Sequence, residues 1–158
     1  GTLFGISDEF SRIRLDLVVN ILVTKALTEG KLTVFGGEQW RPLLHVVDVA
    51  NAIAQTIESD ITGIFNLHYK NFKIIDIAEA IVKKVPSATI ETTPMKFQDA
   101  RNYQVSSEKL YQESGFKAST NLSKGIEEVY DLISNNRIKN VHHNRYSNQN
   151  FLEEYGIT

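Results

Sequence analysis

The sequence predicts a mixed α/β fold in which helices alternate with short strands. Its 158 residues and its hydrophobic content of 42% suffice for one domain with a core of its own. Apolar residues recur at helical spacing in several segments, and short β-branched runs bounded by glycine or proline lie between those segments. No segment repeats another, so an array of structural repeats is not expected.

The composition excludes several classes of protein and of site. With 17 Lys+Arg against 19 Asp+Glu, the chain lacks the cationic excess of proteins that bind nucleic acids or membrane surfaces. It has no cysteine, which excludes a disulfide framework and zinc–thiolate sites. It also contains no long apolar run and no basic leader followed by an apolar segment. We therefore expect a soluble, cytoplasmic protein without nucleic-acid or membrane partners.

The first half of the sequence predicts alternating strands and helices. The opening "GTLFG" is typical of a strand end and a turn, so we expect the sequence to be a piece of a longer protein. Asp48 begins a helix, where it either caps the free amides or lies at the positive end of the helix dipole. The expected elements are a helix over 12–29 that ends at Gly30, a strand over 31–35, a strand beginning at 41 and a helix over 48–59.

The second half is expected to alternate in the same way and to end in a polar tail. The expected elements are strands over 63–69 and 88–93 and helices over 75–85, 106–114 and 122–135. Residues 136–150 are polar and weakly patterned, and the final "FLEEYGIT" could dock as a short segment. We therefore divide the chain into a main region, residues 1–136, and a polar tail, residues 137–158.

The stretch "GGEQWRPLLHVVDVANAI", residues 36–53, is the one that most suggests a site. Arg41 follows two glycines, and Pro42 fixes the backbone after it. A guanidinium held on a loop rim in this way suits bidentate binding of phosphate oxygens. The alternative is a surface arginine stacked on Trp40, which the residue taken alone favours.

His45 and Asp48 lie in the same stretch, and structural interpretations of both outweigh catalytic ones. A histidine inside an apolar strand is more often a hydrogen-bonded core residue than a general base. An aspartate at the start of a helix is more often an N-terminal helix residue than a catalytic carboxylate.

A second candidate anion site lies in "KFQDARNYQVSSEKLYQESGFKAS", residues 96–119. Lys96 and Arg101 flank Asp99, which could orient the arginine toward a bound anion. A surface loop whose salt bridges contribute little to stability is an equally good interpretation.

The remaining motifs do not indicate catalysis or metal binding. Tyr69 and Lys73 have the Tyr-x-x-x-Lys spacing that pairs a phenol and an ammonium on one helix face. Because Tyr69 ends an expected strand and Lys73 precedes an expected helix, we predict no catalytic residue here. No Gly-x-Gly-x-x-Gly or Walker loop is present, so no cofactor-binding residue is expected. His142 and His143 are adjacent rather than at ligand spacing, so no metal site is expected.

These segments, in this order, resemble the C-terminal half of an extended short-chain dehydrogenase/reductase of the NAD-dependent epimerase/dehydratase family, which acts on nucleotide sugars. The resemblance is carried by "GTLFG", "RLDLVVNILVTKAL" with "TEGKLTVFGG", "RPLLHVVDVANAI", "GIFNLHYKNFKIIDIAEAIV", "DARNYQVSSEKLYQESGFKAS" and "NLSKGIEEVYDLI". It covers the chain to about Asn136. It implies the substrate-binding part of an extended Rossmann-type fold, with mixed short strands and helices and without the Gly-rich NAD motif.

The resemblance also implies four substrate-binding residues. Arg41 resembles the arginine that grips the diphosphate of the sugar nucleotide, and Arg101 resembles a second cationic contact. Lys96 lies near the place where many relatives have another arginine. Asn20 resembles a polar position on a helix that lines the nucleotide pocket. His45 and Asp48 would fix the strand-to-helix turn that presents Arg41.

By the same resemblance, the parent enzyme would hold NAD or NADP and its catalytic Tyr/Lys pair in an N-terminal Rossmann half that this sequence lacks. The fragment would bind the nucleotide-sugar diphosphate, but it would carry no cofactor and would not catalyse hydride transfer alone. Separated from the Rossmann half, it would expose an apolar patch, so we expect self-association. The alternative is a stand-alone, non-catalytic module that binds a nucleotide or a protein.

Overall fold

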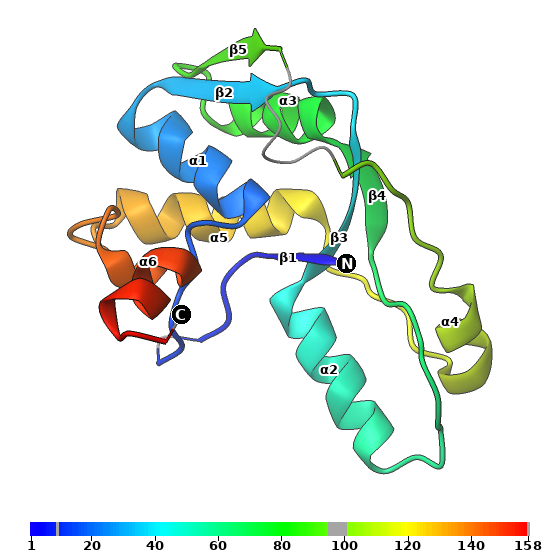
Figure 1. The fold of residues 1–158 in the computed structure, drawn as a ribbon. Helices are drawn as coiled ribbons and strands as arrows, with labels where there is room; N and C mark the ends of the chain where they lie inside the picture. The colour runs from blue at the N-terminus through cyan, green and yellow to red at the C-terminus, as the bar shows by residue number, and fades with distance from the viewer. Residues whose placement is uncertain (9, 95–100, 158) are drawn as a thin grey trace.

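The computed structural model describes residues 1–8, 10–94 and 101–157, and its strands form two small sheets (Figure 1). The first sheet has the order β1-β3-β4, and the second pairs β2 with β5. The β3–β4 pair is antiparallel, whereas β1–β3 and β2–β5 are parallel. In the β1–β3 register, Phe4 lies opposite His45. The strands are β1 (Thr2–Phe4), β2 (Lys31–Phe35), β3 (Trp40–His45), β4 (Lys70–Lys73) and β5 (Thr89–Thr93).

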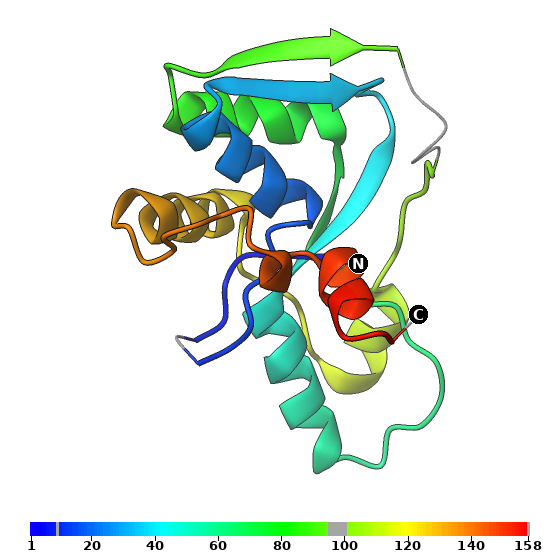
Figure 2. The same ribbon diagram turned by 60° about the vertical axis from the view of Figure 1, so that its left-hand side comes forward.

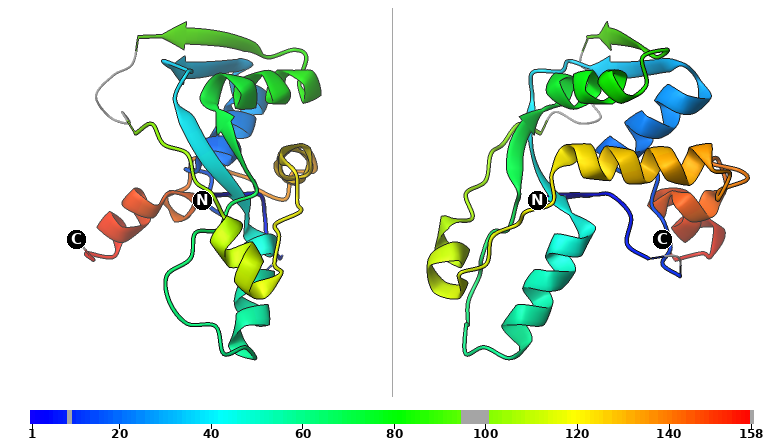
Figure 3. Two further views of the ribbon diagram at one scale, coloured as in Figure 1. Left: turned by 90° about the vertical axis from the view of Figure 1, so that its right-hand side faces the viewer. Right: turned by 180° about the vertical axis from the view of Figure 1, so that it is seen from behind.

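The helices fall into two groups around these sheets. In Figures 1–3, α1 and α3 lie against the β2–β5 sheet, and α5 lies on their far side. In the same views, α2 and α4 extend from the opposite end of the molecule. The described helices are α1 (Val18–Thr28), α2 (Val46–Ile57), α3 (Ile74–Lys84), α4 (Glu108–Ser114), α5 (Leu122–Ser134) and α6 (Asn148–Glu154), with a short 3-10 helix η2 (Asn144–Tyr146).

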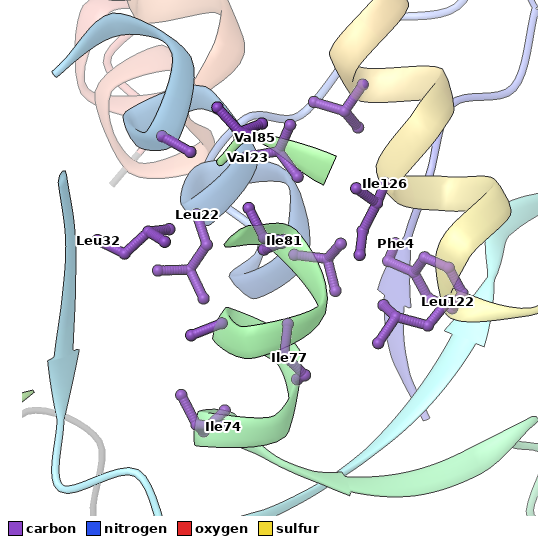
Figure 4. Packing of buried hydrophobic residues seen from close by; sticks show 14 of the residues in the cluster. Phe4, Leu22, Val23, Leu32, Ile74, Ile77, Ile81, Val85, Leu122 and Ile126 are labelled. Carbon is purple, nitrogen blue, oxygen red and sulfur yellow. The ribbon is translucent and has the colours of Figure 1, made fainter. Parts of the chain in front are cut away.

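The main core forms where α1, α3 and α5 meet each other and the strands (Figure 4). The three helices present apolar residues at spacings of three or four, so each has one continuous apolar face. Burial of such a side chain contributes about 1.5–3 kcal/mol relative to exposure. The buried members include Val19, Leu22, Val23, Ile77, Ile81, Ile126 and Val129 from the helices and Phe4 and Leu32 from the strands.

The polar tail is not an extended appendage, because it folds back onto the segment before α1. Leu15 is buried in a second small cluster with Leu132 and Ile138. The backbone N–H of Leu15 donates to the carbonyl oxygen of Tyr146 over 2.9 Å. The tail contains η2 and α6, and the Phe151 ring in α6 contacts the Arg12 guanidinium at 4.6 Å from the ring centroid.

Most expected elements are present, but one expected strand is absent and the helices α1 and α2 begin at residues other than those expected. Residues 63–69 form no strand, and β4 follows them at Lys70–Lys73 instead. The apolar run predicted a strand with one buried face, but Ile64 is 90% exposed and does not pack inward. The helix expected from residue 12 begins at Val18, because residues 12–16 are held in an irregular segment by the tail and by a local Arg14–Asp16 ion pair.

The start of α2 also differs from the expectation. It begins at Val46, and the His45 side chain, not Asp48, caps it by accepting a hydrogen bond from the Val47 N–H. Asp48 lies in the first turn of α2, at the positive end of the helix dipole, which was the second role expected for it, and its side chain reaches the segment before α5. Its carboxylate accepts from the backbone N–H groups of Ser119 (3.2 Å) and Thr120 (2.9 Å) and from the Thr120 hydroxyl (3.1 Å).

None of the helices within the described ranges combines the length and the apolar character that crossing a bilayer requires.

Candidate functional site

A cavity of about 720 Å³ lies between β1, α1, β2 and the start of β3. Arg41 and Arg101, which are far apart in sequence, both line it. Its walls also include Arg14 and Asp16 from the segment before α1, and Lys25 from α1 itself. The cavity is large enough for a small-molecule ligand, and its mixture of apolar walls with a few charged groups is typical of such sites.

Arg41 lies within β3 and is only 4% exposed. The expectation of a guanidinium on a loop rim is therefore corrected, because the arginine is buried in the sheet at the cavity wall. Its Nη1 donates to the Trp40 carbonyl oxygen over 2.8 Å and also to the Arg101 carbonyl oxygen. These bonds hold the guanidinium in one orientation and attach the distant 101–103 segment to it.

The 101–103 segment lies along the start of β3. The Trp40 N–H donates to Asn102 Oδ1 over 3.0 Å, next to the bond between Arg41 and Arg101. Arg101 and Tyr103 are exposed and line the cavity. Lys96 and Asp99, the other members of the candidate anion site, lie outside the described residues.

Asn20 is in α1 and is 1% exposed, but it does not belong to the cavity wall. Its Oδ1 accepts from the Gly5 N–H over 3.1 Å. Its Nδ2 donates to the carbonyl oxygens of Gly5 (3.1 Å) and Arg14 (2.8 Å). The amide thus holds the irregular segment between β1 and α1, which carries Arg14 to the cavity.

Sequence reasoning missed several cavity residues. Gln39 is 6% exposed and holds the turn after β2, because its Nε2 donates to the Phe35 carbonyl oxygen (2.7 Å) and its Oε1 accepts from the Gly37 N–H (2.7 Å). Arg14 and Lys25 add cationic side chains to the wall. In the sequence, Arg14 is only a cationic residue shortly before a helix and Lys25 a cationic residue in its last turn, and many surface residues share such positions.

His45 is a core histidine, as expected. It is 1% exposed, and its Nδ1 accepts from the Val47 N–H over 3.2 Å, so Nε2 carries the hydrogen. Nε2 lies 2.8 Å from Glu128 Oε2, which also accepts from the Ile6 N–H over 3.2 Å. Gly5, with φ of +82°, allows the backbone to pass the imidazole, because a Cβ at this position would lie 2.0 Å from His45 Nε2.

The Tyr-x-x-x-Lys spacing of Tyr69 and Lys73 does not form a catalytic pair in the described part of the chain. Tyr69 precedes β4 and Lys73 ends it, so the two residues share no helical face. The Lys73 ammonium instead binds Glu38 Oε2 over 2.6 Å, and this hydrogen bond raises the pKa of Lys73. Among the described residues, no three His, Cys, Asp or Glu side chains are arranged to hold a metal ion.

Two sequence comparisons point to one family. Residues 2–67 match the model of the NAD dependent epimerase/dehydratase family. The chain is also 30% identical over 122 residues to UDP-glucuronic acid decarboxylase 1 of Arabidopsis thaliana, a match that covers 75% of this chain and 28% of the plant protein.

Solved structures share the fold. The chain superposes on TunA, described as an NAD dependent NDP-hexosamine 5,6-dehydratase of tunicamycin biosynthesis, with a TM-score of 0.74 and 16% identity. This match covers 88% of the chain and 45% of TunA. A UDP-glucuronic acid 4-epimerase from Bacillus cereus, in complex with UDP-4-deoxy-4-fluoro-glucuronic acid and NAD, gives a TM-score of 0.71 at 24% identity. Here the match covers 85% of the chain and 43% of the epimerase, so the chain spans less than half of either protein.

Proposed function

We propose that this chain, a partial homologue of NAD-dependent nucleotide-sugar epimerases, dehydratases and decarboxylases, is the substrate-binding portion of such an enzyme. Arg41 and Arg101 bind the diphosphate of a nucleotide sugar in the cavity between β1, α1 and β2. The observation that carries the proposal is the hydrogen bond from Arg41 Nη1 to the Arg101 carbonyl oxygen, since it joins two distant cationic residues at one cavity.

The charge of the cavity wall supports an anionic ligand. Arg14, Lys25, Arg41 and Arg101 line it, and Asp16 is the one acidic side chain among its described lining residues. An arginine presents a planar fork of donors that matches two phosphate oxygens, and a charge-assisted hydrogen bond is roughly twice as strong as a neutral one. The buried, oriented guanidinium of Arg41 would bind a diphosphate without a large loss of side-chain entropy.

We propose an indirect role in substrate binding for Asn20 and a direct one for Lys96. Asn20 acts indirectly, because its amide holds the backbone of Gly5 and Arg14 beside the cavity. Lys96 remains a proposed additional contact on sequence grounds alone.

We assign the chain to the C-terminal half of the parent enzyme, whose N-terminal Rossmann half would bind NAD or NADP. The described strands do not fit a dinucleotide-binding turn, which needs a strand, a Gly-rich turn and a helix in succession. The Gly36–Gly37 turn after β2 leads into another strand, and β3 passes into α2 at His45 without a glycine. The chain therefore contributes substrate binding, and hydride transfer requires the Rossmann half.

Titration calorimetry of the 158-residue chain with UDP-glucose tests the proposal. We expect Arg41→Ala to weaken binding roughly 10- to 100-fold, because a hydrogen bond to a charged group contributes about 1.5–3 kcal/mol. Arg101→Ala, at an exposed position, should also weaken binding without affecting folding. Arg137→Ala is the matched control, because Arg137 is exposed and outside the cavity wall. Unchanged affinity in both cavity variants would refute the assignment.

A stand-alone, non-catalytic binding module is the alternative function. The exposed apolar residues of α2, including Ile53 and Ile57, favour a protein contact in either case. The intact mass of the native gene product distinguishes the two proposals: a mass near twice 17.9 kDa indicates the enzyme, whereas 17.9 kDa indicates the module.

A further inference from the structure

We propose that Arg14 is a further anion-binding residue of the cavity and that the C-terminal tail positions its guanidinium through Asp16. The anion is an oxyanion of the nucleotide sugar, either of its diphosphate or of a carboxylate on its sugar. This inference rests on the proposed function and adds a residue and a positioning segment to it.

The Arg14 guanidinium is held in place but keeps a donor for a ligand. Its Nε and Nη2 bind the two carboxylate oxygens of Asp16, each over 2.9 Å. Within the described ranges, Nη1 has no hydrogen-bond partner. The side chain is 35% exposed and lines the cavity, and its backbone carbonyl is held by Asn20 Nδ2 over 2.8 Å. A surface ion pair of this kind contributes at most about 1 kcal/mol to stability, but its two hydrogen bonds fix the orientation of the guanidinium.

Asp16 connects Arg14 to the tail. Its Oδ2 accepts both from Arg14 Nη2 and, over 2.8 Å, from the backbone N–H of Asn148 at the start of α6. Burial raises the pKa of Asp16, but the hydrogen bonds from Arg14 and Asn148 and the charge of Arg14 outweigh that effect and lower it overall. The carboxylate is therefore ionised at neutral pH and able to hold the guanidinium.

Further contacts attach the tail to the same segment. Arg12 donates to the Arg145 carbonyl oxygen over 3.3 Å and to Asn148 Oδ1, and its guanidinium lies over the Phe151 ring. The Leu15 N–H donates to the Tyr146 carbonyl oxygen. Residues 12–16 are thus bound to the tail on both sides of Arg14, so displacement of the tail would move Arg14 at the cavity.

The test compares affinities of the full chain for UDP-glucose and UDP-glucuronic acid, with the fold of each variant checked by thermal unfolding. We expect Arg14→Ala to weaken binding of one or both probes about tenfold, as for loss of one charge-assisted hydrogen bond. An equal loss for both probes identifies the diphosphate as the partner. A loss confined to UDP-glucuronic acid identifies the sugar carboxylate.

The Asp16→Ala variant separates positioning from simple charge. Removal of a negative charge from the cavity wall should strengthen anion binding if Asp16 acts only through its charge. If Asp16 positions Arg14, affinity falls instead, despite the more positive cavity. A rise in affinity would overturn the positioning role.

Asn148→Pro tests the contribution of the tail with little other change. Asn148 is the first residue of α6, where proline is tolerated, and Ser147 before it is already extended (φ −114°, ψ 130°). Proline removes both the N–H bound to Asp16 and the Asn148 side chain, whereas the control Asn148→Ala removes only the side chain. We expect a several-fold greater loss of affinity for Asn148→Pro than for Asn148→Ala, and equal affinities would overturn the role of the tail.

Failure of this inference can be distinguished from failure of the proposed function. If Arg41→Ala weakens binding while the Arg14, Asp16 and Asn148 variants bind as the wild type does, only the inference fails. If the wild-type chain binds neither probe, both fail.

Discussion

His45 Nε2 lies 2.8 Å from Glu128 Oε2, and this contact joins the β3–α2 junction to α5 across 83 positions of sequence. The same carboxylate oxygen accepts from the N–H of Ile6, two residues after the end of β1. Glu128 therefore holds together three parts of the chain that meet beside the core: the segment after β1, the start of α2 and the middle of α5. His45, the last residue of the strand β3 that carries Arg41, is held in place by its contact with Glu128.

We expect Glu128→Ala to lower the free energy of unfolding by about 1–3 kcal/mol, because the His45 Nε2–H and the Ile6 N–H would be left without their acceptor. Glu128→Gln keeps an acceptor oxygen and should cost less. Urea denaturation measures both. Glu127→Ala is the control in the same helix, because it removes an exposed ion pair with Lys84 (3.2 Å) that contributes about 0–1 kcal/mol. If the two alanine variants lowered the free energy of unfolding equally, the contacts of Glu128 would contribute no more to stability than an exposed ion pair.

Gly125 in α5 is required by the close approach of Phe4. A Cβ at this position would lie 2.4 Å from both Cδ2 and Cε2 of the Phe4 ring. Gly125→Ala should destabilise the fold by about 1–3 kcal/mol through overpacking, although alanine favours a helix by about 1 kcal/mol over glycine.

Thermal unfolding of Gly125→Ala against Ser123→Ala, an exposed position of the same helix, measures this effect. The double variant Gly125→Ala/Phe4→Leu should recover part of the loss, because the smaller side chain removes the clash. An unchanged or raised midpoint in Gly125→Ala would contradict the packing argument.

Local periodicity was sufficient to predict much of the fold. β2 occupies residues 31–35 as expected, and α5, predicted over 122–135, spans Leu122–Ser134. In both, the alternation or the apolar face is a property of neighbouring residues, and tertiary packing agrees with it. β4 was missed because its position depends on pairing with β3, where Lys70 lies opposite Leu43. The apolar run of residues 63–69 carries no information about that partner.

The candidate site was predictable only in part, for the same physical reason. Arg41 was selected from its local sequence, but its burial and its bond to the Arg101 carbonyl are non-local. Both roles expected for Asp48, as a cap or at the positive end of the helix dipole, are local, and neither includes its hydrogen bonds to Ser119 and Thr120, which are more than seventy positions away. Arg14 was missed altogether, because its position depends on a tail that lacks a clear apolar pattern.

His68 should make the stability of the fold depend on pH. Burial, and to a lesser degree the positive charge of the Gly1 amine, lower the pKa of His68 below its ordinary value of 6.5. The folded state therefore binds fewer protons than the unfolded chain, so stability is complete above pH 6.5 and falls as the pH drops below it. Thermal unfolding on both sides of pH 6.5 should show this fall in the wild type and a weaker one in His68→Gln. His142→Gln, at an exposed histidine, should retain the wild-type dependence, and identical slopes in all three would contradict the prediction.

The surface of α2 should drive self-association of the isolated chain. Ile53 and Ile57 are 57% and 77% exposed and lie one turn apart on the same face. Val47 on this helix is 40% exposed, and Ile64 in the segment after it is 90% exposed. The helix extends away from the main core (Figure 3), so these side chains are accessible to another molecule. An exposed apolar surface of this kind is typical of a site that contacts another protein.

We therefore expect the chain to show concentration-dependent dimers or larger species in size-exclusion chromatography with light scattering. Ile53→Glu/Ile57→Glu should shift the population toward monomer, because a carboxylate in an apolar contact must be desolvated without a partner. Asn51→Glu is the control, since it adds a charge at an exposed α2 position without removing apolar surface. Association that persists in the double variant would place the contact elsewhere, and a wild-type chain that is monomeric at every concentration would show that the exposed isoleucines are tolerated by the isolated fold.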